Sequence, residues 1–297
     1  MNKHLQANLA LLLVALIWGG TFVMVKEAVN DFPVFAFLTL RFSLALVALM
    51  PFCWQRLLAI KRKQAVAGLL TGLFFFAGYA FQTLGLRQTS ASKAGFITGL
   101  YSVIVPLLST LVFRQRPSGS ALAGVALATV GLGLLSLRGN LTVAPGDLLV
   151  LIGAFGFAAH ILAVGRFTPE METLPLTVLQ TTAVVTASAA VSLSTESPSF
   201  DVPTGVLGAA AFTGVVATAL VLFLQTWAQR FTTPTHTALI FSTEPVFAAL
   251  FGYLLANERL GARALAGCGL ILAGMVVAEA RGTLAGVEKP KEGSGNP

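Results

Sequence analysis

The chain has 297 residues, and its composition excludes an ordinary soluble protein. Hydrophobic residues make up 56% and charged residues only 10%, whereas about 25% of the residues in a typical soluble domain are charged. The net charge of +7 does not indicate a nucleic-acid partner, because the basic residues are scattered singly or in short clusters between apolar segments. The composition therefore predicts an all-α polytopic membrane protein.

Ten segments are long and apolar enough to be membrane-spanning helices, which need about 20 mainly apolar residues. The first segment lies where a secretory signal would, but it lacks a small-residue cleavage site and is interpreted as a retained span. The predicted spans, in chain order, are 8–26, 33–54, 65–86, 93–113, 119–137, 147–166, 174–194, 204–228, 235–255 and 261–280.

The basic residues between the spans predict the orientation of the chain. If the amino terminus is cytoplasmic, twelve Lys and Arg residues fall on the cytoplasmic side and six on the other, with the cluster Arg56–Lys63 as the strongest indication. We therefore expect a multi-pass protein of the cell's inner (plasma) membrane with both termini in the cytoplasm. The polar residues 282–297 cannot bury apolar area and are predicted to form a disordered tail.

The second half of the chain repeats the first at an offset of 143 positions. Gln82-Thr83 aligns with Gln225-Thr226, and Ala121–Gly124 aligns with Ala264–Gly267. Paired polar matches of this kind do not follow from apolar composition alone. We expect one repeat at 1–138 and another at 147–281. Because each has an odd number of spans, the second copy must enter the membrane from the opposite face, as in many transporters with a binding site between two inverted repeats.

Several motifs distributed over the chain resemble those of one transporter family. They are, in chain order, Ile17–Phe22, Leu40–Phe42, Ala94–Ile97 before Pro106, Glu244–Leu250 and Asn257–Leu260. They resemble the EamA-type branch of the drug/metabolite transporter superfamily. The resemblance implies ten helices, a central cavity between the halves, and export of amino acids or related small metabolites. The first repeat departs from the pattern, because Arg114-Gln115-Arg116 stands where the family often has Glu before Arg.

Two ionisable residues lie deep in predicted spans, where charge is rare and usually faces the protein interior. Glu244 lies near the middle of the ninth span and precedes Pro245, which disturbs a helix. Its carboxylate could bind a substrate ammonium group or a proton. Arg41, at comparable depth, could bind a substrate carboxylate. The alternative is that Arg41 and Glu244 form a structural ion pair, or that Arg41 extends toward the membrane surface.

Other polar and aromatic residues could also line a substrate site. Gln82 and Gln225 occupy equivalent positions in the two repeats, and each amide needs a protein or water partner in the membrane. His160 could be a proton relay or a neutral group bonded to a neighbouring helix. Among the aromatic residues the candidates are Trp18, Tyr79, Tyr101, Phe157 and Trp227. Tyr101 aligns with Glu244, so we expect the two side chains to face one another.

The predicted function is secondary transport of a neutral or zwitterionic small molecule through the lipid bilayer by alternating access. The chain has no Walker A sequence, no hydrolase motif and no metal-binding spacing around Cys53 or Cys268, so no enzyme activity and no cofactor are predicted. One alternative is a sugar-phosphate or nucleotide-sugar exchanger, but such a protein should have more basic residues within its spans than this chain has. A different class of function, a membrane receptor without transport, is the other alternative. Proton coupling, substrate identity, direction and oligomeric state stay open.

Overall fold

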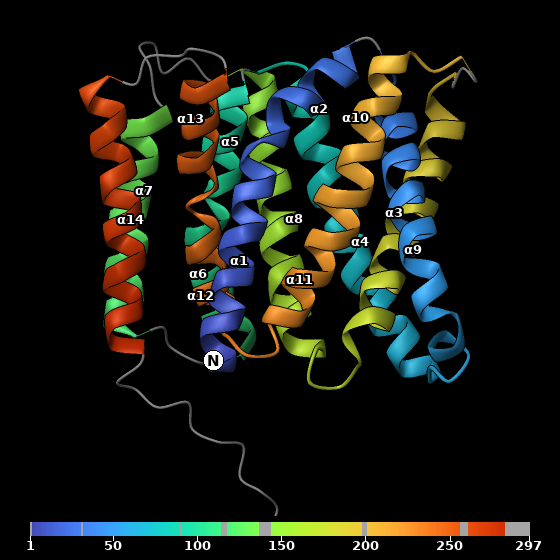
Figure 1. The fold of residues 1–297 in the computed structure, drawn as a ribbon, viewed down its shortest axis with the longest axis horizontal. Coiled ribbons are helices and arrows are strands. Elements are labelled where there is room, and N and C mark those ends of the chain that lie inside the picture. The colour runs from blue at the N-terminus through green and yellow to red at the C-terminus, as the bar shows by residue number, and fades with distance from the viewer. Residues whose placement is uncertain are drawn as a thin grey trace, which may run out of the picture.

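The computed structural model describes residues 2–30, 32–89, 91–113, 118–136, 144–197, 201–255 and 261–282. All secondary structure in these ranges is helical, and the helices form one bundle (Figure 1). Arg114–Arg116, Glu258 and the predicted tail from residue 283 onward lie outside the described residues. The predicted fold class, an all-helical membrane protein, agrees with this bundle.

The helices of the two halves follow in chain order. The first half contains α1 (Lys3–Gly19), α2 (Thr21–Asn30), α3 (Val34–Leu57), α4 (Arg62–Leu86), α5 (Ala91–Gly99), α6 (Tyr101–Phe113) and α7 (Gly119–Ser136). The second half contains α8 (Pro145–Phe167), α9 (Thr173–Thr195), α10 (Thr204–Gly214), the π-helical turn η1 (Val215–Leu220), α11 (Val221–Ala228), α12 (Pro234–Phe241), α13 (Glu244–Leu255) and α14 (Ala262–Gly282).

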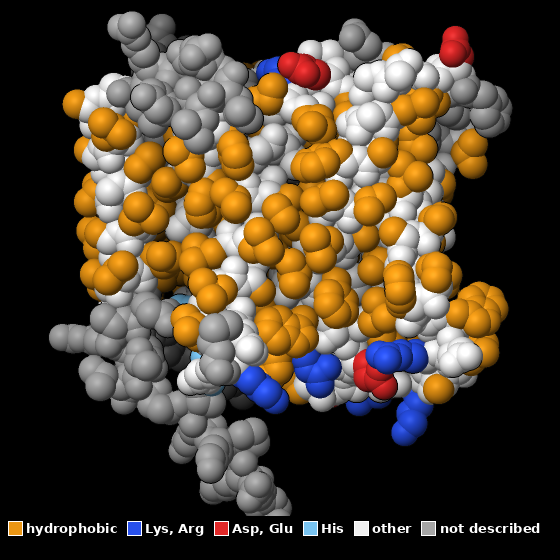
Figure 2. All heavy atoms as spheres, in the orientation of Figure 1, with side chains coloured by type: hydrophobic (Ala, Val, Ile, Leu, Met, Phe, Trp, Pro, Cys, Tyr) orange, Lys and Arg blue, Asp and Glu red, His pale blue; other side chains and the backbone are white. Residues whose placement is uncertain are grey.

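Seven helical segments within the described residues are long and apolar enough to cross a membrane, and α7 and α14 contribute shorter apolar stretches. Figure 2 shows apolar side chains over the middle of the visible face and most of its Lys and Arg side chains along the lower edge. This distribution suits a bilayer around the middle of the bundle, with charged residues at its surfaces.

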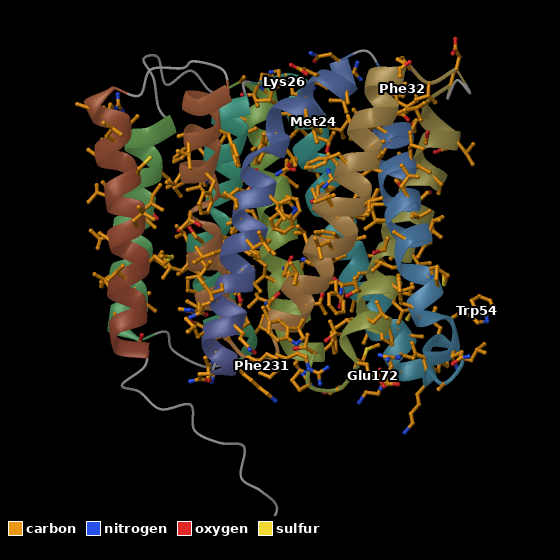
Figure 3. All side chains as sticks on the ribbon, viewed as in Figure 1. Met24, Lys26, Phe32, Trp54, Glu172 and Phe231 are labelled. Atoms are coloured by element: carbon orange, nitrogen blue, oxygen red, sulfur yellow. The ribbon has the colours of Figure 1, made fainter. Side chains whose placement is uncertain are left out.

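Corresponding helices of the two halves run in opposite directions (Figures 1 and 3). The segment α1–α2 runs from the lower edge, where the amino terminus lies, to the upper edge, where Lys26 is labelled. By contrast, α8 ends at the lower edge, because Glu172 at the start of α9 is labelled there. Likewise α3 descends from Phe32 toward Trp54, whereas its counterpart α9 ascends from Glu172.

Glycine permits very close packing of α4 against α8. A methyl group added at Gly156 would lie 2.5 Å from the backbone nitrogen of Gly78, and one added at Gly85 would lie 2.5 Å from the carbonyl oxygen of Gly146. No residue with a side chain fits at such distances unless the helices move apart. The α4–α8 contact joins the two halves and leaves no room for larger residues.

A second close contact joins α7 to α14, at the left of Figure 1. A methyl group added at Gly131 would lie 2.6 Å from the carbonyl oxygen of Gly267, and one added at Gly274 would lie 2.6 Å from that of Gly124. These four glycines occupy equivalent positions in the repeat. The last helices of the two halves therefore pack through equivalent pairs of glycines, one pair from each helix.

One span in each half is interrupted, and the two interruptions lie at equivalent positions of the repeat. The α5–α6 segment breaks at Leu100, and the α12–α13 segment breaks at Ser242 and Thr243, so that Tyr101 and Glu244 are the first residues of α6 and α13. Pro245 lacks an N–H group and is tolerated in the first turn of a helix but not in its interior, which explains why α13 begins here. At the second break the Ser242 and Thr243 hydroxyls are buried and donate to backbone carbonyl oxygens of α12.

Candidate functional site

A central cavity lies within the bundle at the level of the two helix breaks. Its volume is about 50 Å³, enough for only a few water molecules. Its walls contain residues from both halves, which are Trp18, Thr21, Phe22, Val25, Arg41, Phe75, Tyr79, Gln82, Leu86, Thr98, Tyr101, Phe157, His160, Ile161, Gln225, Phe241 and Glu244. The central cavity is therefore small in this structure, and a larger solute requires more space than it offers.

Glu244 and Tyr101 meet across this cavity. The Tyr101 hydroxyl donates to Oε2 of Glu244 over 3.4 Å, and both side chains are buried. Each starts the second part of an interrupted helix, so the equivalent positions of the two repeats face one another. The carboxylate has no basic partner within hydrogen-bond range among the described residues. A buried acid with a single weak neutral partner can accept a cationic or protonated ligand.

Arg41 lies in α3 and is only 2% exposed. Its Nε donates to the hydroxyl of Thr218 at 2.9 Å, and its Nη2 donates to the hydroxyl of Tyr79 at 3.1 Å. Its guanidinium also lies over the Tyr79 ring, 4.6 Å from the ring centre. Arg41 and Glu244 do not form an ion pair, and Arg41 does not extend to the membrane surface. Neither alternative to substrate binding, the ion pair or the extended side chain, is present. Thr218 and Tyr79 instead hold the guanidinium inside the bundle.

The π-helical turn η1 holds two of the cavity residues. Trp18 donates from Nε1 to the carbonyl oxygen of Ala217 at 2.9 Å, and Arg41 donates to the next residue, Thr218. A π-helical turn disturbs the regular α-helical hydrogen-bonding pattern, and such turns are frequent at functional sites. Gly214, just before the turn, allows the backbone of α3 to approach, since a methyl group there would lie 2.5 Å from the Arg41 carbonyl oxygen.

His160 belongs to a buried polar chain on the other side of the cavity. Its Nε2 lies 2.6 Å from Oε1 of Gln180 in α9, and the amide of Gln180 donates to the Thr226 hydroxyl at 3.5 Å. The imidazole ring stacks on Phe75 at 4.2 Å between ring centres. Because no acidic residue in the described part of the chain contacts His160, the arrangement favours a histidine bonded to a neighbouring helix over a proton relay.

The two glutamines that are equivalent in the repeats have different partners. Gln82 donates to the hydroxyl of Thr98 at 3.0 Å, whereas Gln225 donates to Oε1 of Gln229 at 3.1 Å. The side-chain oxygen of Gln225 is buried and accepts no hydrogen bond. An unsatisfied buried acceptor is costly, so this oxygen would gain from a ligand that donates an N–H or O–H group.

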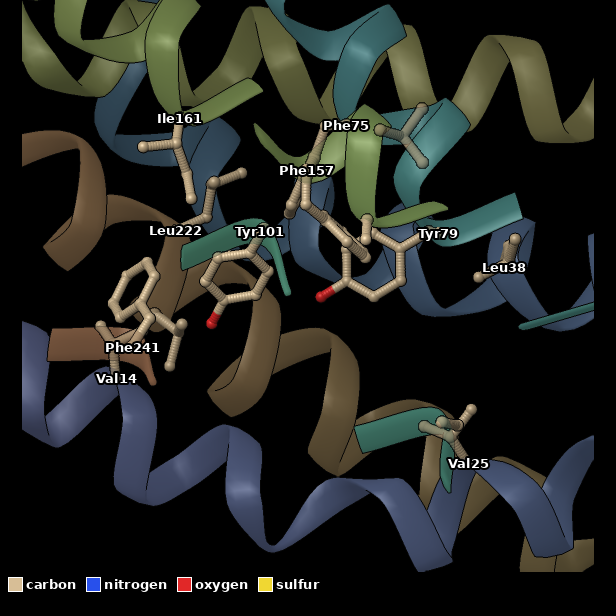
Figure 4. Packing of buried hydrophobic residues seen from close by; sticks show 14 of the residues in the cluster. Val14, Val25, Leu38, Phe75, Tyr79, Tyr101, Phe157, Ile161, Leu222 and Phe241 are labelled. Carbon is tan, nitrogen blue, oxygen red and sulfur yellow. The ribbon is translucent and has the colours of Figure 1, made fainter. Parts of the chain in front are cut away.

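Aromatic rings form much of the cavity wall. Tyr79 packs edge-to-face against Phe75, Phe42 and Phe157 with ring centres 4.8, 5.1 and 5.2 Å away, and Trp18 packs against Phe241 at 5.3 Å. In Figure 4 the hydroxyl groups of Tyr79 and Tyr101 both point toward the space beside α1. The cavity is therefore apolar around its rings and polar at a few defined atoms, which is typical of sites for small organic ligands.

Nine of the ten residues singled out in the sequence line this one cavity: Trp18, Arg41, Tyr79, Gln82, Tyr101, Phe157, His160, Gln225 and Glu244. The tenth, Trp227, does not line it and packs against Phe231 near the lower edge. Sequence reasoning did not select Thr218, Thr98 or Phe241. A hydroxyl in the middle of an apolar span was a usable signal for Thr218, but the π-helical turn that presents it has no sequence pattern.

Hydrogen bonds tie the halves together at both ends of the bundle. At the upper end, Lys26 donates to the carbonyl oxygen of Thr89, whose hydroxyl donates to Asp147 at the start of α8. At the lower end, Nε2 of His236 lies 3.2 Å from Oδ1 of Asn8. Near the start of each half the repeat aligns at an offset of 139 positions, which makes Asn8 equivalent to Asp147. The Thr89–Asp147 and Asn8–His236 contacts thus join the two halves of the chain.

Comparison with known proteins identifies relatives along the whole chain. The chain is 36% identical over 279 residues to an uncharacterized transporter of Archaeoglobus fulgidus, covering 94% of this chain and 87% of that protein. It is 29% identical over 154 residues to a protein of Escherichia coli K12 named a probable amino-acid metabolite efflux pump, covering 50% of this chain and 49% of that protein. A crystal structure with 19% identity covers 92% of this chain and 98% of its own, with a TM-score of 0.78.

The EamA-like transporter family model matches residues 5–137 and 144–279, one match in each half. The resemblance expected from the sequence motifs is thereby confirmed. The family consists of transporters rather than enzymes, and its two domains account for the repeat. This chain is a multi-pass membrane transporter that belongs to the EamA-like transporter family.

Proposed function

We propose that the protein exports amino acids or closely related zwitterionic metabolites by alternating access. Its ten spans form two inverted five-helix repeats at 1–138 and 147–281, and both termini lie in the cytoplasm. Export is favoured because the Escherichia coli relative is named a probable amino-acid metabolite efflux pump. The alignment with that protein covers half of this chain. The opposite directions of corresponding helices support the inversion (Figure 1).

One observation supports a zwitterionic substrate above the others. Arg41 and Glu244 line the same buried cavity without forming an ion pair, so one site contains a separate cationic and a separate anionic group. The Arg41 guanidinium can bind a carboxylate, with the Tyr79 hydroxyl beside it as a second donor. The Glu244 carboxylate and the unsatisfied Gln225 oxygen can accept from an ammonium group.

The decisive experiment is substrate flux in proteoliposomes without ATP. A panel of one amino acid, its amine lacking the carboxylate and its acid lacking the amino group separates the two charged ends. We expect the intact amino acid to be transported and each truncated compound to be transported about tenfold or more slowly, because each loses a charge-assisted hydrogen bond of about 1.5–3 kcal/mol. Binding of the amino acid without flux would instead support a receptor.

Sugar-phosphate exchange is the less favoured alternative. Of the described residues that line the cavity, Arg41 is the one Lys or Arg, whereas a phosphate ester calls for several cationic donors. The same vesicles, loaded with a sugar phosphate, test this alternative directly.

The Thr218→Val substitution should impair transport without unfolding the protein. It removes the acceptor of the Arg41 Nε hydrogen bond but keeps the side-chain shape, so we expect about a tenfold loss of flux. Thr218→Ser should restore it. Thr213→Val is the matched control, because its hydroxyl bonds only to the carbonyl oxygen of Ala209 in its own helix. Equal flux in both valine variants would contradict a positioning role for Thr218.

A further inference from the structure

A second cavity lies at the lower end of the bundle, where α4 begins and α8 ends. Its volume is about 400 Å³, and it shares no lining residue with the central cavity. Lys61 and Lys63 line it on one side, with Val66 and Leu70 further along α4. Phe167, the last residue of α8, and Met171 beyond it form the other wall. The cavity thus has a cationic end and an apolar end.

The position of this cavity matches the boundary of the bilayer. Trp54 and Glu172, labelled at the same edge in Figure 3, mark the level at which aromatic and charged side chains replace purely apolar ones. Val66 and Leu70 are 58% and 44% exposed, so they face the hydrocarbon. Leu70 lies seven residues beyond Lys63, a rise of about 10 Å along the helix. The two lysines are therefore at headgroup level and the apolar wall is at acyl-chain level.

The lysines at the mouth of the cavity have no protein carboxylate of their own. Both are exposed, and neither ammonium forms an ion pair within the ranges that the structure describes. The acid that lines the cavity, Glu170, already has a partner in Arg166. Arg166, through its hydrogen bond and its charge, and to a lesser degree Lys63, lowers the pKa of Glu170. The Glu170–Arg166 pair is neutral as a unit, and it leaves both lysine ammonium groups accessible to an anionic ligand.

The cavity has a defined shape because a glutamine braces it. The Gln64 side chain accepts from the backbone N–H of Lys61 at 3.2 Å and donates to the carbonyl oxygen of Glu170 at 2.9 Å. Gln64 therefore fixes the first turn of α4 against the segment that follows α8. The two walls come from the two halves of the chain, at the end of the glycine-packed α4–α8 contact.

We propose that this cavity binds an anionic phospholipid of the adjacent leaflet. The lipid phosphate lies between the ammonium groups of Lys61 and Lys63, and one acyl chain runs along Val66 and Leu70 beside Phe167. Basic cavities between membrane helices at the headgroup level are suited to anionic headgroups. The bound lipid joins the two halves and favours the state in which α4 and α8 are in contact.

Melting temperatures of the purified full-length protein in mixed micelles test this proposal. Phosphatidylglycerol should raise the melting temperature more than phosphatidylcholine, and titration should give a midpoint about tenfold or more higher for the Lys61→Gln/Lys63→Gln protein. A control, Arg56→Gln/Arg62→Gln, removes two charges from the same edge, one of them paired with Glu172, without altering a lining residue. It should keep the wild-type midpoint. The phosphatidylcholine reference shows whether each variant is folded.

Two results would overturn the proposal. Equal weakening in the lysine and arginine double variants would mean general attraction to an anionic surface. Equal stabilisation by inorganic phosphate would mean that a free anion, not a lipid, binds. Because the readout needs no transported solute, its failure is distinct from a failure of the proposed substrate.

Discussion

Replacing Glu244 by glutamine is expected to reduce amino-acid flux in proteoliposomes by about 10- to 100-fold. The carboxylate is buried in the central cavity, and among the described residues it accepts a hydrogen bond from the Tyr101 hydroxyl at 3.4 Å. Glutamine keeps the shape but removes the negative charge, so a substrate ammonium loses a charge-assisted hydrogen bond of about 1.5–3 kcal/mol, equivalent to about one to two powers of ten.

Two further variants delimit this result. Tyr101→Phe removes only a neutral partner of the carboxylate and should cost less flux than the Glu244 substitution. Glu27→Gln, at an exposed acid in α2 that lines neither cavity, should leave flux near the wild-type value. Measuring all three with and without a proton gradient also separates ammonium binding from proton coupling, since a coupled proton on Glu244 would make only this variant indifferent to the gradient. Wild-type flux in the glutamine variant would exclude Glu244 from the mechanism.

The Gly156→Ala protein should be markedly less stable than the wild type. The added methyl group would lie 2.5 Å from the backbone nitrogen of Gly78 and 2.9 Å from its Cα. Backbone atoms cannot rotate away as a side chain can, so α4 and α8 must separate. Overpacking of this kind costs about 1–3 kcal/mol of unfolding free energy, occasionally more. A thermal unfolding curve in detergent should therefore shift down by several degrees.

Gly208→Ala in α10 is the matched control, because nothing lies within 4 Å of the added methyl group. In an exposed helix the same change usually stabilises, by up to about 1 kcal/mol. The two alanine variants are thus expected to shift the melting temperature in opposite directions. A Gly156→Ala protein that melts with the wild type would show that the α4–α8 contact adjusts easily.

The sequence was sufficient to find the central cavity, because charge and repetition are both readable without coordinates. An ionisable residue in an apolar span must face the interior, which selected Arg41 and Glu244. The repeat then aligned Tyr101 with Glu244, and equivalent positions of opposed units can meet near their common axis. Both arguments depend on the membrane, since in a soluble protein neither residue type would be so restricted.

The partners of Arg41 could not be predicted in the same way. An ion pair with Glu244 was the obvious alternative, but the guanidinium instead bonds Thr218 and Tyr79. Thr218 lies in η1, which departs from α-helical geometry, and the apolar sequence Val215–Leu220 has no pattern that predicts that departure. Similarly, Gly95 resembles a packing glycine yet has open space around it, whereas Gly68 and Gly72 contact α9 tightly. Such details follow from how whole helices cross.

The glycine contact between α7 and α14 bears on how a duplicated chain of this kind could arise. A single five-helix unit carrying Gly124 and Gly131 has both halves of this contact, so two separate copies could have paired through it about a two-fold axis. Fusion into one polypeptide replaces that encounter with an intramolecular one at high effective concentration. Once the pairing no longer depends on identical partners, each copy is free to diverge at its inner positions. The facing pair Tyr101 and Glu244, which occupy equivalent positions of the two halves, is such a divergence.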